Sequence, residues 1–362
     1  MRWTNGITSF YQGDCRKVLA ELPAESVQCV VTSPPYWGLR DFGTGSWQGG
    51  DADCEHTISM PIKWNDPKRG TNYTRPEVAH RGGDSSACFL CGAKRIDRQL
   101  GLEETPDEFV ANMVEVFRAV RRVIRKDGTV WLNLGDSYVS SPAGNFGVGM
   151  PAPADGGRYR QNKPKMNYNG LKPKDLVGIP WRVALALQAD GWYLRSDIIW
   201  SKPNPMPEPV QDRPTKAHEY IFLLTKSPRY YYDADAIRED SKWERWGAQT
   251  IGKQYRGINP IDMDTLDDRR EQGRNKRSVW EITTQPYPEA HFATFPEALV
   301  KPCILAGTKE QDTVLDPFAG SGTVMQVAQQ LGRKSIGVEL NDEYIDLAAK
   351  RLERIPFPMI GI

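Results

Sequence analysis

The sequence predicts an α/β protein with a doubly wound, mainly parallel β-sheet. In the C-terminal part, strand-like runs at 313–315 and 334–338 alternate with helical patterns at 296–306, 324–331 and 343–355. A glycine-rich turn joins the first of these strands to its helix, and another β-branched run, at 27–31, ends directly in two prolines. Strands that alternate with helices form parallel sheets, and ligands bind beyond the carboxyl ends of such strands.

The middle of the chain predicts further elements of the same sheet. Thr105 and Glu108 form a capping-box pattern around Pro106, and apolar residues then recur every three or four positions, which is typical of an amphipathic helix. Beyond this helix we expect, in order, a turn at 126–128, a buried strand at 129–134, a helix at about 180–189, and strands at 193–200 and 219–225. Residues 43–100 have no persistent period and are dense in Gly, Asp, Asn and Pro, which indicates an insertion.

The composition is that of a globular chain without membrane segments. Its 362 residues, 39% of them hydrophobic, are enough for one large α/β domain with insertions. No apolar run reaches the roughly 20 residues that span a bilayer, and residues 1–6 lack the apolar stretch of a signal peptide. We therefore expect a cytoplasmic protein, in which the six cysteines do not form a disulfide framework.

The turn at Asp316–Thr323, DPFAGSGT, has the features of a cofactor-binding loop. Its glycines let the backbone pass close to a ligand, and the following helix offers free N–H groups to a carboxylate. This suits the methionyl end of S-adenosylmethionine, while an acidic residue at the end of the next strand suits two ribose hydroxyls. The glycine loop and the acidic residue also fit NAD, so that Asp316-Pro317-Phe318 is the discriminating element. The predicted cofactor-binding residues in this region are Asp316, Phe318, Gly320, Gly322, Thr323 and Glu339.

The strand at 27–31 leads into Ser33-Pro34-Pro35-Tyr36, which we predict to be the catalytic residues. The exocyclic amine of adenine or cytosine is a poor nucleophile because its lone pair is delocalised into the ring. The hydroxyl of Ser33 and the carbonyl of Pro34 can accept hydrogen bonds from the two amine N–H groups, and the prolines hold these acceptors with little reorganisation. Tyr36 can stack on a base that has been flipped out of a duplex.

Both motifs resemble those of the DNA amino-methyltransferases of restriction–modification systems and phages, which methylate N4 of cytosine or N6 of adenine. The catalytic motif precedes the cofactor loop by about 280 residues, and this order is similar to that of the permuted β class. The resemblance implies a Rossmann-like, S-adenosylmethionine-dependent methyltransferase fold in circularly permuted order. It also implies that Asp14 lies near the cofactor adenine, that Phe295 lies near its methionyl side, and that 132–137 and 199–205 wall the target-base pocket.

On this basis the chain divides at its aperiodic segments. We expect the catalytic part of the methyltransferase domain at 1–42 and 101–238, an insertion at 43–100, a variable segment at 239–277 and the cofactor-binding part at 278–362. The resemblance implies double-stranded DNA as the substrate and a bacterial or phage-infected cell as the setting, with no membrane partner. It also makes a second copy of the chain and a cognate restriction endonuclease candidate partners.

The target base is left open between cytosine and adenine. Serine at position 33 is seen more with N4-cytosine enzymes and favours cytosine, with N6-adenine methylation as the alternative. Methylation of RNA or of a protein glutamine is disfavoured, because those relatives more often carry Asn-Pro-Pro-Tyr after the cofactor loop. A DNA-binding protein that has lost catalysis is disfavoured by the intact Ser33, Tyr36, Asp316 and Gly320.

Cys54, His56, Cys88 and Cys91 form two chelating pairs inside the insertion. Three thiols and one imidazole make a closed tetrahedral zinc site of the structural type. Such an ion would give cohesion to a segment that is poor in apolar residues. His80 could replace His56, and unliganded cysteines on a loop are the alternative to a zinc site.

The net charge of +1 does not by itself indicate a nucleic-acid partner, but the basic residues are clustered. Local basic segments can neutralise phosphates even when the whole molecule is nearly neutral, although solvated loops have the same composition. We expect sequence recognition in 140–175 and 239–277. The predicted DNA-binding residues are Lys163, Lys165, Arg269, Arg270 and Arg274.

Overall fold

The structure is a computed structural model of the chain. It describes residues 1–38, 45–57, 62–65, 72–75, 87–88, 90–96, 99–139, 168–240, 273–284 and 296–356. The chain forms two compact units. The first comprises Met1–Pro34, Met113–Gly135 and Pro180–Ile362, and the second comprises Pro35–Asn112 and Asp136–Ile179.

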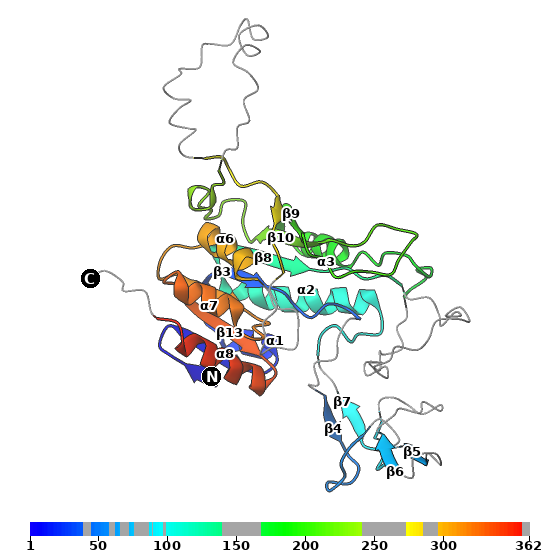
Figure 1. Cartoon of the computed structure of the whole chain (residues 1–362). Coiled ribbons are helices and arrows are strands. Elements are labelled where there is room, and N and C mark those ends of the chain that lie inside the picture. The colour runs from blue at the N-terminus through cyan, green and yellow to red at the C-terminus, as the bar shows by residue number, and fades with distance from the viewer. Residues whose placement is uncertain are drawn as a thin grey trace, which may run out of the picture. The chain divides into compact units, whose positions relative to one another are not determined.

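The described part of the first unit is built on a nine-stranded sheet with the order β1-β2-β13-β12-β3-β8-β10-β9-β11 (Figure 1). Neighbouring strands from β2 to β8 are parallel, whereas β10 runs antiparallel to both β8 and β9. At the two edges, β1 is antiparallel to β2 and β11 is parallel to β9. The strands are β1 (Trp3–Thr4), β2 (Thr8–Gln12), β3 (Val27–Thr32), β8 (Ile124–Leu134), β9 (Tyr193–Ser201), β10 (His218–Thr225), β11 (Val279–Glu281), β12 (Thr313–Asp316) and β13 (Lys334–Glu339).

Helices cover both faces of this sheet. On one face, α6, α7 and α8 share a buried core with alternate strand residues such as Val31 and Leu223 (Figure 1). The intervening residues, such as Val30 and Phe222, are also fully buried, as is expected for a parallel sheet that is covered on both sides. Trp181 of α3 contacts Phe222 on that second face, with ring centroids 5.2 Å apart. The helices are α1 (Cys15–Glu21), α2 (Pro106–Val123), α3 (Ile179–Ala189), the 3-10 helix η1 (Asp235–Ile237), α6 (Glu297–Gly307), α7 (Thr323–Gln330) and α8 (Asp342–Glu353).

The register of the parallel strands brings the carboxyl ends of β2, β13, β12 and β3 to the same end of the sheet. Gln12 in β2 pairs with Glu339 in β13, and Asp316 in β12 pairs with Gly337 one strand further along. β3 pairs with β12 through Val30 and with β8 up to Thr32. The segments that follow these strands therefore emerge together, and this edge is where an α/β sheet binds its ligands.

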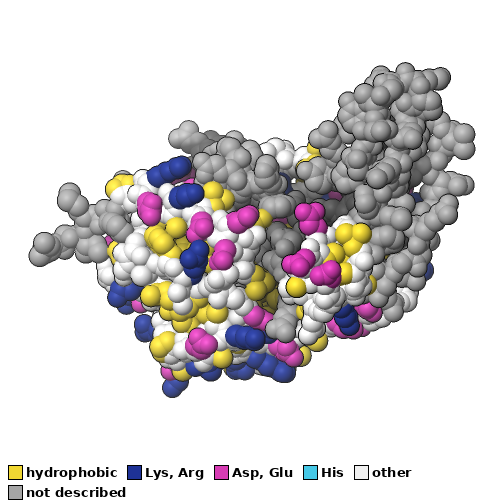
Figure 2. All heavy atoms as spheres, turned by 90° about the horizontal axis from the view of Figure 1, so that it is seen from below, with side chains coloured by type: hydrophobic (Ala, Val, Ile, Leu, Met, Phe, Trp, Pro, Cys, Tyr) yellow, Lys and Arg dark blue, Asp and Glu magenta, His cyan; other side chains and the backbone are white. Residues whose placement is uncertain are grey.

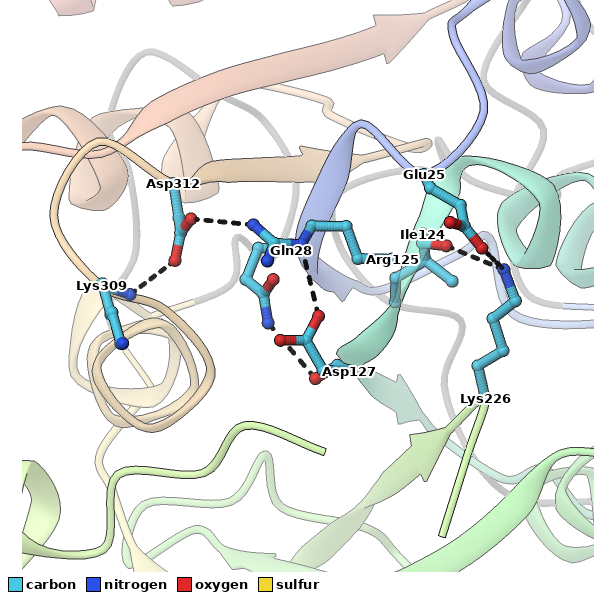
Figure 3. Close-up of polar contacts among 8 residues, drawn as sticks. All are labelled: Glu25, Gln28, Ile124, Arg125, Asp127, Lys226, Lys309 and Asp312. Carbon is cyan, nitrogen blue, oxygen red and sulfur yellow. Dashed lines mark hydrogen bonds and ion pairs between the residues drawn. The ribbon is translucent and has the colours of Figure 1, made fainter. Parts of the chain in front are cut away.

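At the other end of the strands, opposite the predicted motifs, charged and polar contacts hold the sheet together (Figure 3). Arg125 at the start of β8 forms ion pairs with Asp127 at 3.3 Å and with Asp312 before β12 at 3.6 Å. Lys226 after β10 pairs with Glu25 before β3 at 3.1 Å and also donates to the backbone carbonyl of Ile124. These contacts lie at the amino ends of β3, β8 and β12 and at the carboxyl end of the antiparallel β10, away from the end of the sheet where the predicted motifs lie.

The predicted helices and strands are confirmed, with most ends within two residues of the expected positions. The capping box is also confirmed, because the N–H of Glu108 donates to the Thr105 hydroxyl at 3.2 Å and the Glu108 carboxylate accepts from the Thr105 N–H. The predicted turn at 126–128 is wrong. Strand β8 begins directly at Ile124 and absorbs these residues in an irregular stretch, where its register with β3 shifts.

The second unit contains short antiparallel pairs within the predicted insertion. β4 (Ser46–Gln48) pairs with β7 (Lys94–Ile96), and β5 (Ile62–Asn65) pairs with β6 (Asn72–Arg75). None of the helices among the described residues of either unit has both the length and the apolar character of a membrane span. The described part of the insertion thus contains short antiparallel strand pairs of three or four residues a strand.

Candidate active site

The glycine loop connects the end of β12 to the start of α7, next to the centre of the sheet. Gly320 and Gly322 have φ angles of +50° and +79°, which side-chain-bearing residues rarely adopt. A Cβ at Gly322 would lie 2.7 Å from the Cβ of Ala348 in α8, whereas the space beside Gly320 is open among the described residues. Gly322 therefore permits α7 and α8 to pack, and Gly320 permits a ligand to approach the backbone.

The carboxylate of Glu339 lies at the end of β13, against this loop. Its Oε2 accepts a hydrogen bond from the N–H of Gly320 at 2.9 Å, and its Oε1 accepts from the N–H groups of Leu340 and Asn341, both at 2.9 Å. Burial raises the pKa of Glu339, while the three N–H donors act in the opposite direction. An ionised carboxylate has about four acceptor positions, so the group is fixed in place and keeps capacity for a hydroxyl donor. This fits the ribose of the predicted cofactor.

Asp316 links the glycine loop to the strand that precedes the predicted catalytic residues. Its Oδ1 accepts hydrogen bonds from the Thr32 hydroxyl at 2.6 Å and from the Phe318 N–H at 2.9 Å. Burial raises the pKa of Asp316 to about 7, although the hydrogen bonds from Thr32 and Phe318 lower it, and the charge of Glu339 raises it further. Because Thr32 immediately precedes Ser33, this one side chain ties together the starts of both predicted motifs.

Replacing Asp316 by asparagine is expected to raise the free energy of unfolding of the cofactor-free protein at pH 8 and to leave it nearly unchanged near pH 4. The carboxyl has a higher pKa in the folded than in the unfolded state, so the wild-type protein loses stability as the pH rises from about 4 to about 7. Asparagine is neutral throughout and keeps an acceptor for Thr32 and Phe318. Urea unfolding at both pH values measures the difference, and a difference that does not change with pH would contradict the expectation.

Ser33 follows β3 directly, is half-buried and lies at the same edge as the cofactor loop. Its hydroxyl is 3.1 Å from Oδ1 of Asn133, a buried residue of the neighbouring strand β8. Pro34 is buried next to it. Asn133 belongs to the segment 132–137, which the resemblance places at the wall of the target-base pocket without a role for this side chain. The signal was an amide side chain inside an otherwise apolar strand, which must find polar partners.

Tyr36 belongs to the second unit. Two contacts hold the chain around it, one at its backbone carbonyl and one at the side chain of Trp37. Gly101 has a φ of +93°, and a Cβ there would lie 2.9 Å from the carbonyl oxygen of Tyr36. Trp37 is 1% exposed, and its indole N–H donates to the carbonyl of Glu103 at 2.9 Å. Trp37 therefore anchors the chain directly after the predicted catalytic residue Tyr36, and it was not among the predicted site residues.

Asp14 lies beside the end of β13, because the N–H of Gly13 donates to the backbone carbonyl of Glu339 at 2.9 Å. The Asp14 side chain caps α1 by accepting from the N–H of Arg16 at 2.9 Å, and it also forms an ion pair with the Arg16 guanidinium at 2.9 Å. Burial raises the pKa of Asp14, but the hydrogen bonds and the charge of Arg16 outweigh it and lower the pKa overall. A contact of Asp14 with adenine stays a prediction, and Phe295 lies outside the described residues.

The two segments expected to wall the base pocket contain residues with clear structural partners. Asp136 accepts from the N–H groups of Gly178 and Ile179 at 3.0 and 3.1 Å, and so holds the start of α3. Lys202, which follows β9, forms an ion pair with Glu219 at the start of β10. Both side chains hold neighbouring elements together, whatever their relation to a base.

Of the predicted DNA-binding residues, Arg274 alone lies within the described part of the chain. Its guanidinium forms an ion pair with Glu239 at 2.9 Å, and Arg277 pairs with the same carboxylate at 2.6 Å. On the face shown in Figure 2, acidic and basic side chains are interspersed over the described surface. The residues predicted to contact DNA that lie outside the described residues are Lys163, Lys165, Arg269 and Arg270.

The second unit brings together the four residues predicted to bind metal. The ligand atoms of Cys54, His56, Cys88 and Cys91 all lie within 4.8 Å of one another. The sulfurs of Cys54 and Cys88 are 3.9 Å apart, and Cys91 Sγ is 3.2 Å from Nδ1 of His56. His80, the alternative ligand, lies outside the described residues. The structure thus assembles the four-residue set, including His56, around one point.

The strand order, the glycine loop between β12 and α7, and the carboxylate at the end of β13 fit an S-adenosylmethionine-dependent methyltransferase. A family model described as DNA methylase, of the N6/N4 type, matches residues 27–350. The chain belongs to this N6/N4 DNA methylase family. It is a DNA amino-methyltransferase of the restriction–modification type, with its motifs in permuted order.

Relatives of known class match over most of the chain. The type II methyltransferase M.Cfr9I of Citrobacter freundii is 43% identical over 96% of this chain and 88% of its own length. M.SmaI of Serratia marcescens is 40% identical over 94% of this chain and 89% of its own length.

Two solved structures show the same fold. PvuII DNA methyltransferase, described as cytosine-N4-specific, has a TM-score of 0.56 and 17% identity, covering 98% of this chain and 89% of its own. A putative DNA modification methylase of Thermus thermophilus, TTHA0409, in complex with S-adenosyl-L-methionine, has a TM-score of 0.52 and 20% identity, covering 96% of this chain and 94% of its own.

Proposed function

We propose that this enzyme methylates N4 of a cytosine that is flipped out of duplex DNA within a specific sequence. The observation that carries the proposal is the position of Ser33, which has a neutral hydroxyl. Ser33 directly follows Thr32, and the Thr32 hydroxyl donates a hydrogen bond of 2.6 Å to Asp316 at the start of the proposed cofactor loop. The description of the PvuII enzyme, which shares the fold, as cytosine-N4-specific supports the same base. N6-adenine methylation is the alternative.

The protein groups act on the amine by binding and orienting it. S-adenosylmethionine supplies a methyl group on a positively charged sulfur. The Ser33 hydroxyl oxygen and the Pro34 carbonyl accept the two amine N–H groups, which directs the nitrogen lone pair away from the ring and out of conjugation. These acceptors need little reorganisation, because Pro34 is buried and the strand before it is fixed by Asp316. Tyr36 stacks on the extrahelical base and offsets its lost stacking.

Expression of the protein in a methylation-free bacterial host, followed by nucleoside mass spectrometry and modification-sensitive sequencing, tests this function. The expected result is N4-methylcytosine at one short sequence motif, and none in cells that carry Ser33→Ala. N6-methyladenine instead would overturn the choice of base. An absence of any methylated base, with cofactor binding intact, would overturn the catalytic assignment of Ser33.

We also propose that the cluster of Cys54, His56, Cys88 and Cys91 binds a structural zinc ion. Tetrahedral zinc with Zn–S of about 2.3 Å and Zn–N of about 2.0 Å sets its sulfur ligands about 3.8 Å apart and sulfur from nitrogen about 3.5 Å apart. The corresponding distances of 3.9 and 3.2 Å are close to these edges. Four protein ligands leave no open position, so the ion would act in folding and not in methyl transfer.

The chain around the cluster is shaped to bring the ligands together. The N–H of Gly92, at a φ of +73°, donates to the carbonyl of Cys88 at 2.9 Å, which closes the turn that carries both Cys88 and Cys91. Gly50 leaves room for this turn, because a Cβ there would lie 2.7 Å from the Cys91 sulfur. The indole of Trp47 packs on the ring of His56, with centroids 5.1 Å apart. These features support a built site over free loop cysteines.

The protein purified without chelators is expected to contain one zinc ion per chain, and Cys91→Ser is expected to lose it. Loss of the ion should make the second unit sensitive to trypsin, because binding energy of the metal is folding energy of the site. Elemental analysis and limited proteolysis measure both effects. Cys15→Ala removes a buried thiol of the first unit and is the matched control. Absence of zinc from the wild-type protein would remove the site.

The partners and the setting follow from the same proposal. DNA contacts are assigned to Lys163, Lys165, Arg269, Arg270 and Arg274, which combine long cationic side chains with segments that differ from the sheet in composition. A cognate restriction endonuclease and a second copy of the chain are the proposed protein partners, in line with the type II methyltransferase class of the relatives. The proposed location is the cytoplasm of a bacterial or phage-infected cell, where duplex DNA is available.

A further inference from the structure

Asn133 is a polar side chain inside the apolar strand β8, and it contacts the proposed catalytic serine. It is 1% exposed and lies between Leu132 and Leu134, which are both fully buried. Its strand neighbours are β3, which ends next to Ser33, and β10, where Ile221 is its paired residue. A buried amide costs free energy unless both of its ends are hydrogen-bonded, so its partners define its role.

The hydrogen bonds of Asn133 fix which way its amide faces. One end is 3.1 Å from the backbone carbonyl of Tyr220, which can only accept, so this end must be the NH₂ group. The other end, Oδ1, is then the atom 3.1 Å from the Ser33 hydroxyl. Since Oδ1 can only accept, Ser33 must be the donor. The hydrogen bonds therefore run in one direction: Ser33 donates to Asn133, and Asn133 donates to the Tyr220 carbonyl.

This direction determines what Ser33 offers to a substrate. A hydroxyl has one hydrogen and two acceptor lone pairs, and here the hydrogen is committed to Asn133. A base amine presents N–H donors, so it requires an acceptor opposite it. An aspartate in the place of Ser33 would be an acceptor without assistance, whereas a serine can rotate and present its hydrogen instead. A neutral catalytic serine thus needs a group that takes up its hydrogen.

We propose that Asn133 is a positioning residue that holds the Ser33 hydroxyl as an acceptor for the target amine. This inference rests on the proposed function. It extends the site from the catalytic loop into β8 and β10, and it assigns a chemical reason to the buried amide. In this role Asn133 acts through Ser33.

A double-mutant cycle in kcat tests whether Asn133 acts through Ser33. Asn133→Ala is expected to lower kcat about tenfold, which corresponds to the loss of one neutral hydrogen bond, with the affinity for S-adenosylmethionine unchanged. In a Ser33→Ala background the same change should alter kcat by less than about twofold, because the group on which it acts is gone. If Asn133→Ala lowers kcat by the same factor in the wild-type and Ser33→Ala backgrounds, the inference is overturned.

Two replacements of similar size separate positioning from packing. Asn133→Asp keeps an acceptor for Ser33, and its buried carboxyl can donate to the Tyr220 carbonyl when it is protonated, so kcat is expected within about threefold of wild type at a pH where it is protonated. Asn133→Leu removes the acceptor and should match the alanine variant. Equal impairment of the Asp and Leu variants, with cofactor binding intact in both, would overturn the role. Thr129→Val on the same strand, whose hydroxyl contacts Cys29, is the control and should leave kcat unchanged.

The wild-type protein separates a failure of this inference from a failure of the proposed function. If the wild-type enzyme methylates DNA and the effects of the two substitutions on kcat are independent, only the role of Asn133 is overturned. Wild-type enzyme that binds S-adenosylmethionine but methylates no DNA overturns the proposed function together with this inference.

Discussion

Ser33→Ala is expected to lower kcat for DNA methylation by about 10²- to 10³-fold, with DNA affinity within about threefold of wild type. The hydroxyl supplies one of the two acceptors that hold the amine as its nitrogen develops positive charge, and removing one such preorganised group costs about this much in other enzymes. Single-turnover methylation and equilibrium DNA binding measure the two quantities on the same preparation.

The strand that carries Ser33 also offers the control for this experiment. Ser26 lies just before β3, at the opposite edge of the sheet, and its hydroxyl donates to the carbonyl of Pro23 at 2.8 Å. Ser26→Ala should therefore leave both quantities unchanged. Equal losses of turnover and DNA affinity in Ser33→Ala would show that this residue binds the substrate uniformly and does not act on the transition state.

Glu339→Ala is expected to raise the dissociation constant for S-adenosylmethionine by roughly 10- to 100-fold. The carboxylate keeps one acceptor position for a ribose hydroxyl, and one hydrogen bond to a charged group contributes about 1.5 to 3 kcal/mol. The change also leaves the N–H groups of Gly320, Leu340 and Asn341 without their acceptor, so the loop itself should lose order. Isothermal titration calorimetry gives the affinity, and thermal unfolding shows whether the fold survives.

Two further variants make the result interpretable. Glu339→Gln keeps the size of the side chain and one acceptor oxygen, so its dissociation constant should fall between those of the wild type and the alanine variant. Glu343→Ala, an exposed residue in the first turn of α8, is the matched control. A folded Glu339→Ala protein with wild-type cofactor affinity would rule out this residue as the ribose acceptor.

The sequence was sufficient to predict the elements that have a strong period or a strong boundary signal. The C-terminal strands and helices and the capping box at Thr105 are of this kind. The elements β2 and α1 were not predicted, because Thr8–Gln12 mixes polar and aromatic residues and α1 has only seven residues. Tertiary pairing stabilises them: β2 pairs along its whole length with β13. Local patterns do not report such a partner.

The residues of the candidate site could be predicted from sequence motifs, but the hydrogen bonds between them could not. Ser33, Asp316 and Glu339 could be chosen from the chemistry that their neighbours in sequence imply. The hydrogen bonds that orient them come from Thr32, Gly320 and Asn133, and these contacts cross between strands whose order only the fold supplies. The metal ligands were predictable for the opposite reason, since Cys and His spacing limits their geometry directly.

The backbone pairing of Glu239 with Arg274 has a consequence for how this enzyme family can diversify. Each of the two residues donates its N–H to the carbonyl of the other, at 3.0 and 2.9 Å, and their side chains form an ion pair. The two ends of the stretch 240–273 are therefore held at paired residues, and a change in the length of this stretch is expected to alter the free energy of loop closure only slightly. We therefore expect this predicted recognition segment to vary in length and sequence among relatives that share the methyl-transfer site.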